Sequence, residues 1–137
     1  MPARINLTGR RGIHQGDTRL WHFSVVAPDD AVVGGRSPVD LTGAQVTCTV
    51  REASGGGLLW QGSTRDQGVT VVTGSFPGVQ VEIPAEATTR MLTGNHLSAY
   101  AGGRFPTCVY DVQIDWPSGR TTTVAVGLVE VSPGVTR

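Results

Sequence analysis

Two cysteines and three histidines are the residues of this sequence whose side chains could act as nucleophiles or bind a metal ion. His14, His22 and His96 are isolated, and no acidic residue accompanies them at the spacing of a metal-binding motif. Cys48 and Cys108 are too few and too far apart for a zinc site or a disulfide framework. We therefore predict no metal site.

The patterns of the common catalytic sites are also missing. Cys108 lies in an alternating apolar segment, on the phase that points inward, which predicts a buried and unreactive thiol. No serine lies in a Gly-x-Ser-x-Gly elbow. The glycine clusters precede neither a helix nor a lysine and so predict turns, not phosphate-binding loops; they are Gly34-Gly35, Gly55-Gly56-Gly57 and Gly102-Gly103. We expect no catalytic residue, no bound cofactor and no enzymatic activity.

Length and charge set further limits. The 137 residues fit one domain, residues 1–137, and only 16% of them are charged, which favours a surface that contacts neighbouring proteins. The formal net charge of zero provides no overall field to attract nucleic acid or an anionic membrane, so we expect neither as a partner. No apolar run approaches the roughly 20 residues of a membrane helix, and no signal peptide is recognisable, which predicts synthesis in a cytoplasm.

Strand patterns dominate the chain, with apolar residues alternating along short segments that glycine and proline separate. We predict strands at about 20–26, 44–51, 58–60, 69–73, 79–83, 108–116 and 121–131, with a loop over 28–38. One short helix is expected over about 85–92, and the apolar phase slips at Gly127, which predicts a β-bulge there. Seven or eight such strands predict an all-β, antiparallel, immunoglobulin-like β-sandwich.

The residues on the inward-pointing side of the predicted strands form the expected core. The side chains assigned to it are Trp21, Phe23, Cys48, Trp60, Cys108, Tyr110 and Trp116. Cys48, Trp60 and Cys108 follow the order Cys, Trp, Cys that immunoglobulin domains also have, and the likeness is one of architecture only. A reducing compartment favours two buried thiols, and a disulfide formed later between the two inward cysteines remains open.

The order of segments resembles a set of small tailed-bacteriophage proteins, among them the N-terminal domain of phage baseplate upper proteins. The likeness rests on Asp40-Leu41-Thr42-Gly43 before a strand that ends in Arg51-Glu52, and on Tyr110-Asp111-Val112 followed by the turn at Ser118-Gly119. Asp40 and Thr42 are turn formers, Gly43 can adopt positive φ, and Leu41 can close one end of the sandwich. We expect the Tyr110 hydroxyl to reach the backbone near the short helix.

This resemblance implies a structural protein of the virion, made in the cytoplasm of the host bacterium. Its partners would be other virion proteins of the tail, baseplate or neck, with copies of the chain forming a homo-oligomer or symmetric array. Two alternatives remain: a capsid-decorating protein that stabilises the head, and a carbohydrate- or host-surface-binding module.

Three segments are candidate contact surfaces. They are the long loop Thr93–Pro106, an N-terminal arm over residues 1–12 and a C-terminal arm over residues 132–137. The phage proteins that the chain resembles connect the same two elements with only a few residues, so this loop is long by comparison. It also carries residue types that anchor interfaces. The candidate partner contacts are Arg4, Arg10, Arg11, Leu97, Tyr100, Arg104 and Phe105.

Overall fold

The structure, a computed structural model, describes residues 3–8, 11–29, 35–52, 56–73, 77–91 and 107–132. The strands in these ranges are β1 (Ala3–Arg4), β2 (Ile13–His14), β3 (Arg19–Phe23), β4 (Val26–Asp29), β5 (Gly35–Pro38), β6 (Gln45–Arg51), β7 (Leu58–Ser63), β8 (Val69–Val72), β9 (Gly78–Ile83), β10 (Thr107–Asp115) and β11 (Thr121–Ser132). The helix α1 covers Ala85–Thr89. No helix in the described ranges is long and apolar enough to cross a membrane.

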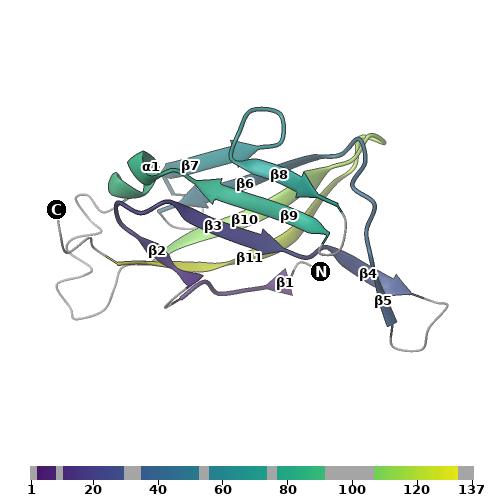
Figure 1. The fold of residues 1–137 in the computed structure, drawn as a ribbon, viewed down its shortest axis with the longest axis horizontal. Helices are drawn as coiled ribbons and strands as arrows, with labels where there is room; N and C mark the ends of the chain where they lie inside the picture. Colours follow the sequence, from purple (N-terminus) through teal and green to yellow (C-terminus); the bar gives the residue numbers. More distant parts are fainter. Residues whose placement is uncertain are drawn as a thin grey trace.

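Two sheets pack face to face. The larger has the order β1-β11-β10-β6-β7, with β2 also paired to β11, and the smaller has the order β3-β9-β8. When β1 and β2 are taken as one interrupted strand along β11, the sandwich has 8 strands. In Figure 1 the three-stranded sheet lies across the larger one, with α1 at one end of the molecule. The prediction of an all-β sandwich with one short helix is confirmed.

The pairing is antiparallel except where β1 and β2 run parallel to β11. This order places consecutive strands in alternate sheets at several points, as in immunoglobulin-like domains, where one sheet is G-F-C and the other is B-E-D. The sheets close over one core because their inward side chains alternate with outward ones. In β10 the alternation is regular, with Cys108, Tyr110, Val112 and Ile114 buried.

An aromatic cluster fills the centre of the core. Trp21 and Phe23 from β3 face Tyr110 from β10, with ring centroids 5.8 Å and 5.9 Å from that of Tyr110. All three side chains are buried. Trp60 and Trp116 are half-buried and pack against the outside of this core.

Cys48 and Cys108 are buried free thiols. They lie in adjacent strands of one sheet, where Cys48 pairs with Val112, four residues along β10 from Cys108. Four residues of strand span about 13 Å, whereas a disulfide requires Cα atoms within about 7 Å. The register of β6 and β10 therefore explains why the two inward cysteines do not meet.

The Asp40–Gly43 turn forms as its residue types predict. The Asp40 carboxylate accepts hydrogen bonds from the Thr42 backbone N–H at 3.0 Å and from its hydroxyl at 2.6 Å. Gly43 has φ +77°, and Leu41 is buried. These hydrogen bonds hold the pKa of Asp40 below its usual value.

The segment 28–38 was predicted to be a loop; that prediction is wrong for residues 28–29 and 35–38, while residues 30–34 lie outside the described residues. Residues 26–29 and 35–38 pair as the antiparallel strands β4 and β5. Figure 1 shows this hairpin extending from one end of the sandwich, where it forms its own two-stranded sheet. Its sequence lacks the regular alternation of a half-buried strand, which explains why periodicity did not identify it.

The bulge predicted at Gly127 lies instead at Val124. Val112 pairs with Ala125 and Gln113 with Thr123, which leaves Val124 as the extra residue. Gly127 has a different role, because a Cβ there would lie 2.1 Å from the carbonyl oxygen of Ile5. A glycine inside a strand often marks such a close approach of another backbone segment.

The N-terminal segment was expected to be an arm, but its described part belongs to the larger sheet. The backbone N–H groups of Ile5 and Leu7 donate to Val126 and Leu128 of β11 at 2.9 Å and 2.8 Å. The Tyr110 hydroxyl donates to the Ile5 carbonyl at 2.6 Å, and so reaches this segment and not the helix region as expected. Unpaired backbone groups of β11 favour such an added strand.

The helix α1 is shorter than the predicted 85–92 and is fixed by Thr88. The buried Thr88 hydroxyl accepts a hydrogen bond from the Gly16 N–H at 3.1 Å and lies 2.8 Å from the Asp17 carbonyl. These contacts join α1 to the turn between β2 and β3. Thr88 and Thr89 both have a low intrinsic helix propensity, yet Thr88 is the residue that holds the helix in place.

Candidate protein-binding face

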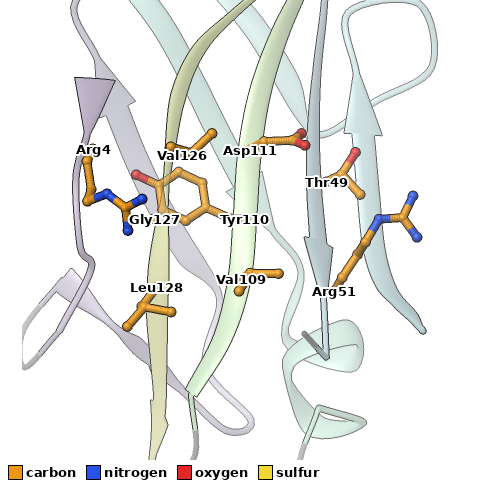
Figure 2. Close-up of a pocket in the computed structure, with 9 residues that line it drawn as sticks. All are labelled: Arg4, Thr49, Arg51, Val109, Tyr110, Asp111, Val126, Gly127 and Leu128. Carbon is orange, nitrogen blue, oxygen red and sulfur yellow. The ribbon is translucent and has the colours of Figure 1, made fainter. Parts of the chain in front are cut away.

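The outward side of the six-stranded sheet presents two adjacent rows of side chains, which we call the outer sheet face. It consists of Arg4, Thr49, Arg51, Leu58, Val109, Asp111, Val126 and Leu128. Seven of these residues, all except Leu58, are among those that line a hollow of about 330 Å³. Figure 2 shows Arg4 at one side of the hollow, Arg51 at the other and Asp111 between them.

The first row is largely apolar. The strand register places Leu128 beside Val109, Val109 beside Arg51, and Arg51 beside Leu58. Directly paired residues share a face and contact one another. Leu128 is 41% exposed and Leu58 is 54% exposed, so the row has an exposed leucine at each end and the Arg51 side chain near its middle.

The second row is polar. Arg4 pairs with Val126, Val126 with Asp111, and Asp111 with Thr49. Thr49 is buried although it lies on the outward side, and its hydroxyl accepts a hydrogen bond from the Gln61 amide at 3.1 Å. This side of the sheet is therefore partly covered by its own side chains.

Partial burial affects the charged groups of the face. Burial raises the pKa of Asp111, and the nearby Arg51 guanidinium opposes this rise. Arg51 also donates a hydrogen bond to the Gly56 carbonyl at 3.4 Å. Arginine is among the residue types enriched at protein interfaces, and on this face a half-buried arginine lies beside exposed apolar side chains.

The described residues contain no metal-ligand cluster and no ionised thiol. Nowhere in the described ranges do three His, Cys, Asp or Glu side chains gather closely enough to hold a metal ion. Burial raises the pKa of the Cys48 thiol to about 12 and that of Cys108 to about 11, so neither is a thiolate at neutral pH. His14 lies in β2 and His22 in β3, on different sheets, while His96 lies outside the described residues.

The contact residues expected from the sequence are divided among several places. Arg4 lies on the outer sheet face, and Arg11 lies at a separate cleft beside β3. The other expected contacts lie outside the described residues; they are Arg10, Leu97, Tyr100, Arg104 and Phe105. The loop Thr93–Pro106 lies outside as well, and so does the C-terminal segment after Ser132.

Sequence reasoning missed most of the outer sheet face. The alternation along residues 44–51 and 108–116 puts Thr49, Arg51 and Asp111 on the outward phase, but it cannot place them next to Leu58 and Leu128 without the strand register. The sequence held one sign of this face: two strands carry an apolar residue on their outward phase, Val109 in β10 and Leu128 in β11. Searches of protein-family models, curated proteins and solved structures find no match for this chain.

Proposed function

We propose that this chain is a non-enzymatic structural protein of a bacteriophage virion that binds neighbouring virion proteins through the outer sheet face. The observation that carries the binding role is the row from Leu58 to Leu128, which leaves two large apolar side chains exposed beside a half-buried arginine. The virion assignment rests on the resemblance of the Asp40–Gly43 and Tyr110–Val112 motifs to phage tail and baseplate proteins. Under this proposal the chain is an accessory component of the tail, baseplate or neck.

Physical considerations support a protein partner for this face. The row contains two exposed leucines. When a partner surface covers them, the removal of their apolar surface from water stabilises the complex by roughly 25 cal/mol for each Å² buried. Arg4, Arg51 and Asp111 can add directional polar contacts around the apolar row. Backbone pairing between β11, β10 and β6 holds most of this face in one conformation, which reduces the entropy lost on binding.

The first test is the protein content of virions. Tailed phage particles are purified from a phage whose genome encodes this chain, and quantitative mass spectrometry measures the copy number of the chain relative to the major capsid protein. We expect the chain in a fixed ratio after density-gradient purification. Its absence from particles would disprove the virion role.

The second test addresses the face itself. Leu128→Asp places a charge in the apolar row, and we expect the variant to fold but to be lost from particles, because the charge would be buried in the interface. Thr70→Asp, on the exposed side of β8 in the other sheet, is the matched control and should be retained. Equal retention of both variants would exclude the outer sheet face as the attachment surface.

The two alternatives give different results in these experiments. Localisation by cryo-electron microscopy distinguishes tail, baseplate or neck attachment from decoration of the capsid shell. A carbohydrate- or host-surface-binding module would bind glycans as the isolated chain, and glycan-array binding by a chain that is missing from particles would replace the present proposal.

A further inference from the structure

A second cleft lies between the two sheets, with β3 of the smaller sheet on one side and the N-terminal segment and β11 of the larger sheet on the other. It has a volume of about 390 Å³, and its interior is apolar, with Trp21, Phe23 and Ala125 from the core and Ile5 and Leu7 from the N-terminal segment. Arg11 and Arg19 also line it. None of these residues belongs to the outer sheet face.

One wall of this cleft is the edge of β3 that faces away from β9. β3 pairs with β9 and is the end strand of its sheet within the described part of the chain. Consecutive residues 19–25 all line the cleft, including both the inward Trp21 and the outward, 51% exposed Leu20. A strand contributes both of its side-chain phases to a cleft when its backbone edge faces that cleft. An edge strand presents unpaired backbone groups to which another extended segment can hydrogen-bond.

The arginines at the cleft indicate that such a segment should carry a negative charge. The Arg19 Nε atom is buried and has no hydrogen-bond partner in the described structure. A buried donor without a partner costs free energy that an incoming acceptor recovers. A carboxylate is the acceptor that pairs best with a guanidinium, and Arg11 adds a second positive charge at the same cleft. Partial burial also lowers the pKa of Arg19.

We propose that the cleft between β3 and the N-terminal segment binds an extended peptide segment of a partner protein, which pairs with the β3 edge, inserts apolar side chains toward Trp21 and Phe23, and places one carboxylate on Arg19. This site is separate from the outer sheet face and does not depend on the virion role. Every residue from 19 to 25 lines the cleft, and a cleft that follows seven consecutive residues of the chain favours an extended peptide as the ligand over a small apolar acid.

Selection from a displayed library of random ten-residue peptides on the folded protein tests the proposal. We expect enrichment of sequences in which apolar residues alternate and one residue is Asp or Glu. Binding of an enriched peptide should shift the backbone amide signals of residues 19–25 in NMR spectra. The same peptide with Gln or Asn in place of its acidic residue should bind about tenfold more weakly.

Two variants and one control locate the binding. Arg19→Met should weaken the peptide about tenfold by removing the cation, and Ser24→Trp should abolish binding by filling the cleft from an exposed position. Arg120→Met, in the exposed turn after β10, removes a charge elsewhere and should leave affinity unchanged. Enriched peptides without an acidic residue, or peptides whose affinity neither cleft variant changes, would overturn the proposal.

Discussion

At the scale of single residues, the Tyr110 hydroxyl connects the core to the N-terminal segment. It donates to the Ile5 carbonyl at 2.6 Å while its ring packs on Trp21 and Phe23. Tyr110→Phe keeps the ring but leaves this carbonyl without its donor. We expect the free energy of unfolding to fall by about 1–3 kcal/mol, measured by urea denaturation. Ser118→Ala, in an exposed turn, is the control and should change stability little; an equal loss in both variants would contradict the role of the hydroxyl.

The two thiols test the core in a different way. Cys48 and Cys108 are buried, and burial raises the pKa of both thiols, so the native protein presents no thiolate near neutral pH. We expect a chromogenic disulfide reagent at pH 8 to modify neither thiol in the native state and both in guanidinium chloride. Rapid modification of a native thiol would contradict the burial of both thiols, and an intramolecular disulfide between Cys48 and Cys108, detected by mass spectrometry in air-oxidised protein, would contradict the register of β6 and β10.

At the scale of elements, Gly127 determines how closely the N-terminal segment approaches β11. A Cβ at this position would lie 2.1 Å from the Ile5 carbonyl oxygen, and that atom belongs to backbone that cannot rotate away. We expect Gly127→Ala to destabilise the protein by about 3 kcal/mol and to remove hydrogen-exchange protection from the Ile5 and Leu7 amides. Gly57→Ala is the matched control, because its Cβ would meet the flexible Glu52 side chain at 3.3 Å and should cost little.

The helix α1 depends on Thr88 for its attachment. Thr88→Val keeps the side-chain shape but leaves the partly buried Gly16 N–H without its acceptor. We expect a loss of about 1–3 kcal/mol in thermal or urea unfolding. Thr89→Val is the control, since Thr89 is exposed and its hydroxyl bonds within the helix to the Ala85 carbonyl at 2.8 Å. If both variants lost the same stability, helix propensity and not the contact with the turn would be the cause.

These elements also show what the sequence could and could not predict. Period-2 alternation identified β6, β9, β10 and the inward phase of their apolar residues, because a strand with one face on a core must alternate. It did not identify β4 and β5, which form a hairpin outside the sandwich. It misplaced the bulge in β11, because Gly127 breaks the apolar pattern for a reason that depends on Ile5, a residue distant in the chain.

At the scale of the whole molecule, the fold class followed from composition and alternation, whereas the candidate site depended on strand register. Leu58 and Leu128 lie far apart in sequence and share a row only because β7, β6, β10 and β11 are neighbours in that order. Topology of this kind arises from contacts between distant segments, which local patterns do not encode. The cleft at β3 has the same origin, since Arg19 and Ile5 line it from different sheets.

The pH dependence of stability reports on the whole core. The chain contains no lysine, so cysteine and tyrosine are the side chains that titrate between about pH 9 and 12. Burial raises the pKa of Cys108 from 9.0 to about 11, that of Cys48 from 9.0 to about 12 and that of Tyr110 from 10.0 to about 12. These groups stay protonated in the folded state after they have ionised in the unfolded chain. Because the unfolded state then binds fewer protons, stability is fully present below about pH 9 and falls as pH rises.

We therefore expect the urea midpoint to be insensitive to these three groups up to about pH 8 and to decline steadily above pH 9. Replacing both cysteines, Cys48→Ala with Cys108→Ala, should lower stability at every pH but flatten the decline between pH 9 and 10, because Tyr110 begins to contribute only above about pH 10. Circular dichroism at fixed urea concentrations measures both profiles. A decline of the same slope in the double variant would show that the buried thiols are not its source, and the core would then have to be more open to hydroxide and water than its packing indicates.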